Sequence, residues 1–256
     1  MNRFLILAFL FFIGCMIGWG IEVIFRRFQP DNKDRKWINP GFLVGPYLPI
    51  YCFGLCTLYL LAGLEKYIHV DNHILQKLLL FLVMAIAMTA IEFVAGEIFI
   101  LKMHVKLWDY TNSKGNYKGI ICPLFSFFWA VLGAVYYFLI HPYVLHSLEW
   151  FSKNLVFSFV IGFFYGVFCI DICYSFKIAS KIKKFAEDNN MVIRYEEFKR
   201  HIRTTAEEKK EKYRFLLAMN SETGLAEHLS RYRDKQREQA KLQKLNDFIE
   251  KKIKKK

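Results

Sequence analysis

Long apolar runs alternate with short polar connections over the first two thirds of the chain. A helix needs about 20 mainly apolar residues to cross a bilayer, and five segments meet that requirement: 4–25, 42–64, 75–101, 120–140 and 155–176. The first has too long an apolar core for a signal peptide, and no small-x-small cleavage site follows it. The pattern therefore predicts an all-α membrane protein with five transmembrane helices.

The pattern changes after residue 176. Residues 177–256 contribute +10 of the formal net charge of +13, and MNSETG at 219–224 divides them into two expected helices. In the second helix apolar residues recur at spacings of three, four or seven: Leu225, Leu229, Tyr232, Leu242, Leu245, Ile249 and Ile253. We therefore expect a transmembrane domain, 1–176, and a basic cytoplasmic helical tail, 177–256.

The connections between the spans predict the orientation, because cytoplasmic loops carry an excess of Lys and Arg. The connections at 26–36 and 102–118 are basic, whereas the other two carry few Lys or Arg residues. With five spans, this places the N-terminus outside and the C-terminus in the cytoplasm.

Four carboxylic acids lie within the expected spans. An ionised group at the bilayer centre costs roughly 2.5–3.5 kcal/mol on insertion scales, so Glu22, Glu92, Glu97 and Asp171 need an explanation. In the predicted orientation all four lie in the cytoplasmic half. Two interpretations stay open: the acids accept hydrogen bonds and serve helix packing, or they bind a cation, a proton or a polar substrate.

Small residues recur every three or four positions in three of the spans: Gly14 and Gly18 before Glu22; Ala85, Thr89 and Gly96 around Glu92; Ser158, Gly162 and Gly166. Such stripes let helices approach closely in lipid. We expect the three stripes to face one another, which would bring Glu22 and Glu92 into the bundle interior.

The stretch PGFLVGPYLPIY, residues 40–51, opens the second span with helix-breaking residues. Pro46 and Pro49 lack an N–H group, and Gly41 and Gly45 permit unusual backbone angles. Non-helical backbone at membrane depth survives only when it is buried in protein or lines a wet cavity. A structured cytoplasmic mouth is one interpretation, and a proline in the first turn of a helix is the simpler one.

The third connection adds polar and aromatic residues on the same predicted side. An acid lies between two interfacial aromatic residues, and turn-forming residues precede span four: Trp108, Asp109, Tyr110, Asn116 and Gly119. Three segments distant in sequence thus place unusual residues on one face of the membrane.

Six motifs together resemble a known family: GWGIEV at 18–23, NPGFLVGPYLPIY at 39–51, Glu92, WDY at 108–110, NYKGIIC at 116–122 and HP at 141–142. The chain resembles, over about residues 10–145, the bacterial putative ABC-transporter type IV membrane proteins. The resemblance implies a multi-pass protein of the bacterial cytoplasmic membrane that is related to transporter permeases. It also implies signature positions: Trp19, Glu22, Gly41, Gly45, Pro46, Pro49, Glu92, Trp108, Asp109, Tyr110, Asn116, Gly119 and Cys122.

The chain departs from that family pattern at two positions. Pro40 stands where relatives often have Arg, and Ile120 where they often have a polar residue. An anion contact made by those groups in relatives would be absent here. The chain also lacks a G-x-x-x-x-G-K-[ST] loop, so any ATPase would be a separate subunit.

The cysteines and histidines favour structural roles. All six cysteines lie within predicted spans: Cys15, Cys52, Cys56, Cys122, Cys169 and Cys173. We expect small apolar packing rather than disulfides, redox chemistry or metal binding. Four histidines, at 69, 73, 141 and 146, lack a recognisable zinc spacing, so we expect neither a metal nor a cofactor.

The basic tail has three candidate uses. It would pack on the rest of the protein, form a coiled coil, or lie on anionic lipid headgroups of the inner leaflet. Lipid or a cytoplasmic protein is the expected partner. Nucleic acid is not, because no reading motif accompanies the charge.

Three hypotheses for function follow. The first is a permease-like or accessory transport subunit that holds a small polar or cationic ligand at Glu22 and Glu92; five spans are few for a transporter, so this predicts a homo-oligomer. The second is a non-transporting scaffold that recruits a partner through its tail. The third is an intramembrane lipid-modifying enzyme using Glu92 and Asp109 as acid and base. It is least supported, because no catalytic nucleophile or metal motif accompanies these acids.

Overall fold

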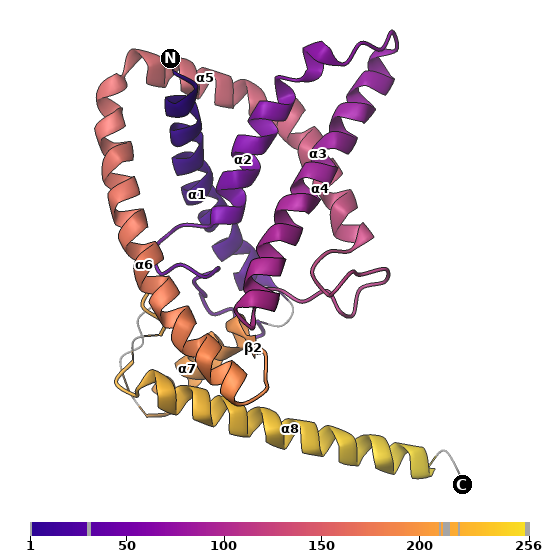
Figure 1. Cartoon of the computed structure of the whole chain (residues 1–256), viewed down its shortest axis with the longest axis vertical. Coiled ribbons are helices and arrows are strands. Elements are labelled where there is room, and N and C mark those ends of the chain that lie inside the picture. The colour runs from indigo at the N-terminus through magenta and orange to yellow at the C-terminus, as the bar shows by residue number, and fades with distance from the viewer. Residues whose placement is uncertain (1, 30–31, 210, 212–215, 220, 254–256) are drawn as a thin grey trace. The chain divides into compact units, whose positions relative to one another are not determined.

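The computed structural model describes residues 2–29, 32–209, 211, 216–219 and 221–253, the last seven by their backbone only. The chain is mostly helical and divides into two compact units, Met1–Val192 and Ile193–Lys256 (Figure 1).

The first unit contains the apolar helices. Its elements are α1 (Arg3–Phe28), α2 (Pro49–Ala62), the 3-10 turn η1 (Glu65–Tyr67), α3 (His73–Gly96), the π-helical η2 (Glu97–Lys102), β1 (Val105–Lys106), α4 (Pro123–Val135), the π-helical η3 (Tyr136–Ile140), α5 (His141–Lys153), η4 (Leu155–Phe157) and α6 (Ser158–Asp188). Asn2 and Asn72 cap α1 and α3 by accepting hydrogen bonds from first-turn amides. Prolines open α2, α4 and α5, where the missing N–H costs nothing.

Four helical stretches within the described residues are long and apolar enough to cross a membrane: Arg3–Phe28, His73–Lys102, Pro123–Lys153 and Leu155–Asp188. The all-α membrane class is therefore confirmed. The expected second span differs from the other four, because its helix α2 has only 14 residues. The Pro- and Gly-rich stretch before Pro49 stays non-helical, which shortens this segment.

Consecutive helices of this unit pack in pairs, α1 along α2, α2 along α3 and α3 along α4 (Figure 1). Their shared core includes Phe9, Leu80 and Met84. Helix α5, which the sequence suggested was only a connection, joins this core through Val144, Leu148 and Phe151; the Phe151 ring stacks on Phe9 at 4.6 Å between centroids.

The small-residue stripes do not face one another, so that expectation was wrong. A Cβ on Gly18 would lie 2.3 Å from the Cβ of Tyr51 in α2, and one on Gly96 would lie 2.1 Å from Ile120. Among the residues that the structure describes, no group of another element lies within 4 Å of a Cβ placed on Gly162 or Gly166. The glycines instead permit close packing within helix hairpins and of the 103–122 loop.

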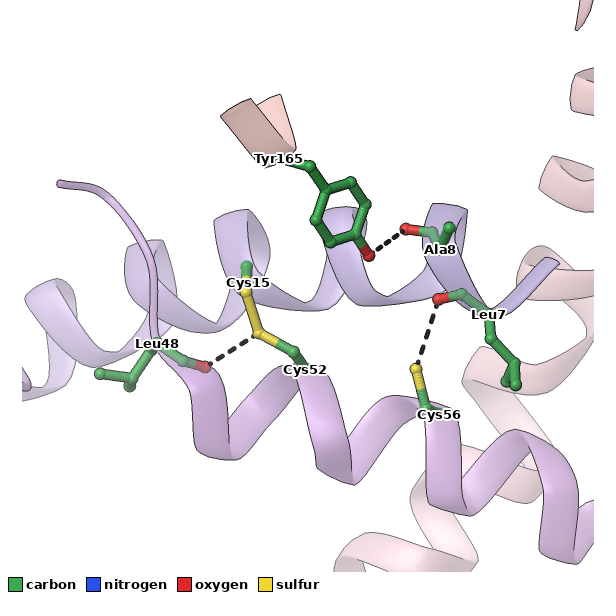
Figure 2. Close-up of a disulfide and its surroundings, with 7 residues drawn as sticks. All are labelled: Leu7, Ala8, Cys15, Leu48, Cys52, Cys56 and Tyr165. Atoms are coloured by element: carbon green, nitrogen blue, oxygen red, sulfur yellow. Dashed lines mark hydrogen bonds between the residues drawn. A yellow bond between two sulfur atoms is a disulfide. The ribbon is translucent and has the colours of Figure 1, made fainter. Parts of the chain in front are cut away.

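The expectation that the cysteines are unpaired was also wrong for one pair. Cys15 of α1 and Cys52 of α2 form a buried disulfide, with their Cα atoms 4.8 Å apart (Figure 2). Gly14 lets the helices come this close, because a Cβ there would lie 3.1 Å from the Cα of Cys52. One turn further along α2, the Cys56 thiol donates to the carbonyl of Leu7 at 3.6 Å.

The second unit contains β2 (Ile193–Arg194), α7 (Tyr195–Glu208) and α8 (Leu225–Ile253). Phe198 and Tyr232 join α7 to α8, with ring centroids 5.4 Å apart. In the expected apolar stripe of α8, Leu229 and Tyr232 are buried, whereas Leu242 and Leu245 are 55% and 53% exposed. The side chains of Ile249 and Ile253 lie outside the described part of the structure. The tail was expected to hold two helices, but residues 177–188 instead continue α6 before α7 and α8.

Candidate functional site

The non-helical stretch before α2 is held by Asp171 of α6. The backbone amides of Val44 and Gly45 donate to its two carboxylate oxygens, at 3.1 and 2.6 Å. The hydroxyl of Ser175 donates to the same carboxylate at 2.8 Å. Asp171 is 8% exposed, and it accepts from two backbone amides that would be costly to bury without an acceptor.

The glycines and Trp19 fix the path of the same stretch. Trp19 donates its indole N–H to Asn39 at 2.7 Å, and Asn39 donates to the carbonyl of Val44 at 2.9 Å. Gly41 has a φ of +77°, which favours glycine. A Cβ on Gly45 would lie 2.2 Å from the ring of Tyr47.

The two prolines mark where the helix begins. Pro46 and Pro49 flank Tyr47 and Leu48 in the sequence, and the side chains of these two residues are buried. Helix α2 starts at Pro49. Because neither proline carries an N–H group, the stretch leaves fewer amides to satisfy. The mouth residues predicted in this stretch, Gly41, Gly45, Pro46 and Pro49, thus belong to an ordered, partly buried segment.

Glu22 is compensated by a cation. Arg26, one turn along α1, donates to one carboxylate oxygen at 3.0 Å, and the hydroxyl of Tyr51 donates to the other at 2.9 Å. The same tyrosine packs against Gly18, so the hairpin of α1 and α2 positions the Glu22 carboxylate.

Glu92 is held by neutral donors. Tyr110 donates its hydroxyl to one oxygen at 2.8 Å, and Trp129 of α4 donates its indole N–H to the other at 3.1 Å. The side chain is buried, with 3% of the residue exposed. Within the described parts of the chain, no Lys or Arg lies at ion-pair distance from Glu92.

The loop that carries Tyr110 is ordered by its own hydrogen bonds. Trp108 donates to the carbonyl of Ile120 at 2.8 Å, and the amide of Tyr110 donates to the carbonyl of Gly119 at 2.9 Å. Asn116 accepts from the amide of Gly119 at 3.1 Å, and Gly119 has a φ of +68°. The Tyr110 ring stacks on Phe125, with centroids 4.2 Å apart. These contacts hold the Tyr110 hydroxyl at Glu92.

Asp109 and Glu97 each pair with a lysine. Lys106 lies 3.0 Å from Asp109, and Lys118 lies 2.7 Å from Glu97. Burial alone would raise the pKa of Asp109, but hydrogen bonds from Thr111 and Lys106 outweigh it and leave that pKa below its usual value. Both acids therefore support the fold of the loop.

Of the predicted acids, Glu92 contacts the third connection, through the hydroxyl of Tyr110. Burial raises the pKa of Tyr110, and the carboxylate of Glu92 raises it further. Asp171 and Glu97 have no hydrogen bond or ion pair to Glu92 or Tyr110 in the described chain.

Two members of the site were missed from the sequence. Tyr51 and Trp129 supply donors to Glu22 and Glu92. The sequence suggested Trp or Tyr as donors, but no spacing identified which ones, because each donor comes from a different helix than its acid.

Comparison with known proteins agrees with these motifs. A family model described as "Putative ABC-transporter type IV" matches residues 9–176. Neither the curated proteins nor the solved structures offer a match. The matched range includes most of every apolar helix and every site residue described above, and the chain therefore belongs to the putative ABC-transporter type IV family.

Proposed function

We propose that the protein is a permease-like or accessory transport subunit whose Glu92 binds a small cation or a proton. Its family and its apolar helices fit a membrane transporter-like protein. The ligand site is our proposal, and it rests on the neighbours of Glu92.

The supporting observation is that Glu92 is buried with only neutral donors. Three of the other four candidate acids pair with a cation: Arg26 for Glu22, Lys118 for Glu97 and Lys106 for Asp109. Asp171 also lacks a cation in the described chain, but it accepts three hydrogen bonds, two from backbone amides and one from Ser175, whereas Glu92 accepts two from side chains. A buried carboxylate without a cation is costly. It therefore takes up a proton or an external cation, and both are ligands of the kind a transport site exchanges.

The topology completes this proposal. We propose five spans with the N-terminus outside, in which the 40–48 stretch and α2 together form the second span. Helix α2 alone is about 21 Å long at 1.5 Å per residue, short of a hydrocarbon core of about 30 Å. The buried, hydrogen-bonded stretch before it supplies the rest of the depth.

Two partners follow from the same proposal. Transport driven by ATP would need a separate ATPase subunit, because the sequence has no phosphate-binding loop of its own. Five spans are few for a transport pathway, so we also propose a homo-oligomer.

The test is a thermal-stability screen of the purified full chain against Na⁺, K⁺, Mg²⁺, ammonium compounds and pH. A ligand that binds the native state raises the unfolding midpoint by mass action. We expect at least one cation, or a proton, to stabilise the wild type and to lose this effect in Glu92→Gln. Glu97→Gln is the matched control, because its acid already pairs with Lys118. Equal responses in all three proteins would reject Glu92 as the site.

One observation favours a second function, a scaffold that recruits a cytoplasmic protein through α8. That helix continues for 21 residues beyond Tyr232, and its apolar residues Leu242 and Leu245 are exposed among basic side chains. Replacing both leucines with Glu would abolish co-purification of such a partner, whereas Gln239→Glu and Ala240→Glu would preserve it. If the wild type brings down no specific protein in membranes from its own host, the scaffold function is rejected.

A further inference from the structure

A second polar cluster lies at the other end of α3. Lys77 donates to the carboxylate of Glu65 and to the hydroxyl of Tyr137, and Tyr137 also donates to Glu65. The Lys77 ammonium lies 4.0 Å from the centroid of the Tyr137 ring. Glu65 of η1 and Tyr137 of η3 thus both contact one lysine of α3, and neither the motifs nor the Glu92 site accounts for this cluster.

A second pair extends these polar groups into the core. The hydroxyl of Tyr136 lies 3.0 Å from Nδ1 of His141, and the His141 ring stacks on Tyr137. Tyr136 is 2% exposed. Both tyrosines belong to the π-helical segment η3, which joins α4 to α5, and such segments frequently occur at functional sites.

Helix α3 connects this cluster to Glu92 along one face. Lys77, Leu80, Met84, Met88 and Glu92 follow one another at spacings of three or four residues, and the last four are buried. Lys77 and Glu92 are 15 residues apart, which is about 22 Å along a helix. One stripe therefore has a charged residue at each end and two methionines between them.

Glycines stand opposite both methionines. A Cβ on Gly133 of α4 would lie 3.1 Å from the Cβ of Met84, and one on Gly54 of α2 would lie 2.8 Å from the terminal methyl of Met88. Methionine is unbranched and changes rotamer easily. Each methionine fills the space beside a glycine, so it packs directly on the backbone of the neighbouring helix.

We propose that the seam between α2, α3 and α4 is the path by which the cation or proton reaches Glu92. Met84 and Met88 close it in the middle, and Glu65, Lys77 and Tyr137 close its far end. This inference rests on the proposed function of Glu92. The Lys77 ammonium occupies the place at Glu65 that a mobile cation would take, so the far end is closed until that ion pair is broken.

The test uses a cysteine reporter at Met84 in the full chain. Cys56, Cys122, Cys169 and Cys173 are first replaced by Ala, and the Cys15–Cys52 disulfide is kept. Met84→Cys is then treated with a cationic methanethiosulfonate applied to both faces of the membrane. Ile86→Cys is the matched control, because Ile86 is on the same helix but 61% exposed on its outer surface.

With Glu65 intact, we expect Met84→Cys to be nearly unreactive. Glu65→Gln keeps the shape of the side chain but removes the charge, and we expect the labelling rate to rise by about tenfold or more, because the population of the opened state sets that rate. The rate for Ile86→Cys should stay unchanged. If Glu65→Gln does not purify as a folded protein, Tyr137→Phe replaces it, because this change removes only the hydroxyl that bonds to Glu65 and Lys77.

Three results would overturn the path. Met84→Cys could stay unreactive in a folded Glu65→Gln or Tyr137→Phe protein, it could react equally with Glu65 intact, or the labelling rate of Ile86→Cys could rise by the same factor.

The thermal response to cations is measured in the same background. If that response is kept while Met84→Cys stays unreactive, the path is wrong and the Glu92 site stands. If Met84→Cys becomes reactive while no cation stabilises the protein, the proposed function of Glu92 is rejected instead.

Discussion

Asp171 and Glu92 are both buried acids on apolar helices, yet their partners differ in kind. Asp171 binds two backbone amides and a serine hydroxyl. Glu92 binds the side chains of Tyr110 and Trp129 only. Backbone amides at the start of a span have few other acceptors, whereas an aromatic hydroxyl and an indole N–H tolerate a change of partner. We therefore propose that the same residue chemistry serves as an anchor at Asp171 and as an exchangeable site at Glu92.

The largest expected effect is on the anchor. Asp171→Ala would leave the amides of Val44 and Gly45 buried without acceptors, and each such loss costs roughly 1–3 kcal/mol. We expect the free energy of unfolding to fall by about 2–4 kcal/mol, measured by denaturation of the full chain in mixed detergent micelles. Ser175→Ala is the control, with a loss of about 1 kcal/mol. Equal losses for both variants would show that Asp171 is not an anchor.

The Cys15–Cys52 disulfide reinforces the same region, because Cys52 lies in the first turn of α2. Replacing both cysteines with Ala should destabilise the protein by about 2–4 kcal/mol, in the same denaturation assay. The cation response assigned to Glu92 should be kept, since neither sulfur contacts that acid. Mass spectrometry after alkylation should find four free thiols in the wild type; six would contradict the bridge.

A smaller effect is expected at the partners of Glu92. Tyr110→Phe removes one hydroxyl and should cost about 1 kcal/mol of stability, while changing the cation concentration needed for half-maximal stabilisation. Tyr165→Phe removes a hydroxyl that donates to the carbonyl of Ala8 elsewhere in the protein, and it should leave that concentration unchanged. If both variants shift it equally, the effect is general packing.

The smallest expected effect concerns the loop that carries Tyr110. The pKa of Asp109 is lowered in the folded protein, so its contribution to stability is present above its unfolded pKa and is lost as the pH falls below about 4. Asp109→Asn should flatten the acid limb of the stability curve near that pH. An unchanged acid limb would mean that Asp109 does not stabilise the loop.

Much of the fold could be predicted from the sequence, because lipid imposes long apolar runs on a helix that crosses it. The first, third, fourth and fifth expected spans correspond to helices long enough to do so. The start of α2 could not be placed, because it depends on Asp171, which lies 127 residues from Val44. Helix α5 was missed because apolar residues cover only one of its faces, through Val144, Leu148 and Phe151.

The site was less predictable than the fold. Single acids in apolar runs identified Glu22 and Glu92, because charge at membrane depth is costly. Their partners come from other helices and loops, such as Trp129, which is 37 residues from Glu92, and no periodicity reports such pairs. The disulfide was not predicted for the same reason, since its cysteines are 37 residues apart and only the packing of α1 on α2 brings them together.

The central claim, that Glu92 is exchangeable and Asp171 is not, can be tested directly by infrared difference spectroscopy. The spectrum is recorded while pH and cation concentration are changed over the membrane-embedded full chain. We predict a change in a carboxyl band that disappears in Glu92→Gln and persists in Asp171→Asn. A carboxyl change that persists in Glu92→Gln, or no change in the wild type, would contradict the account.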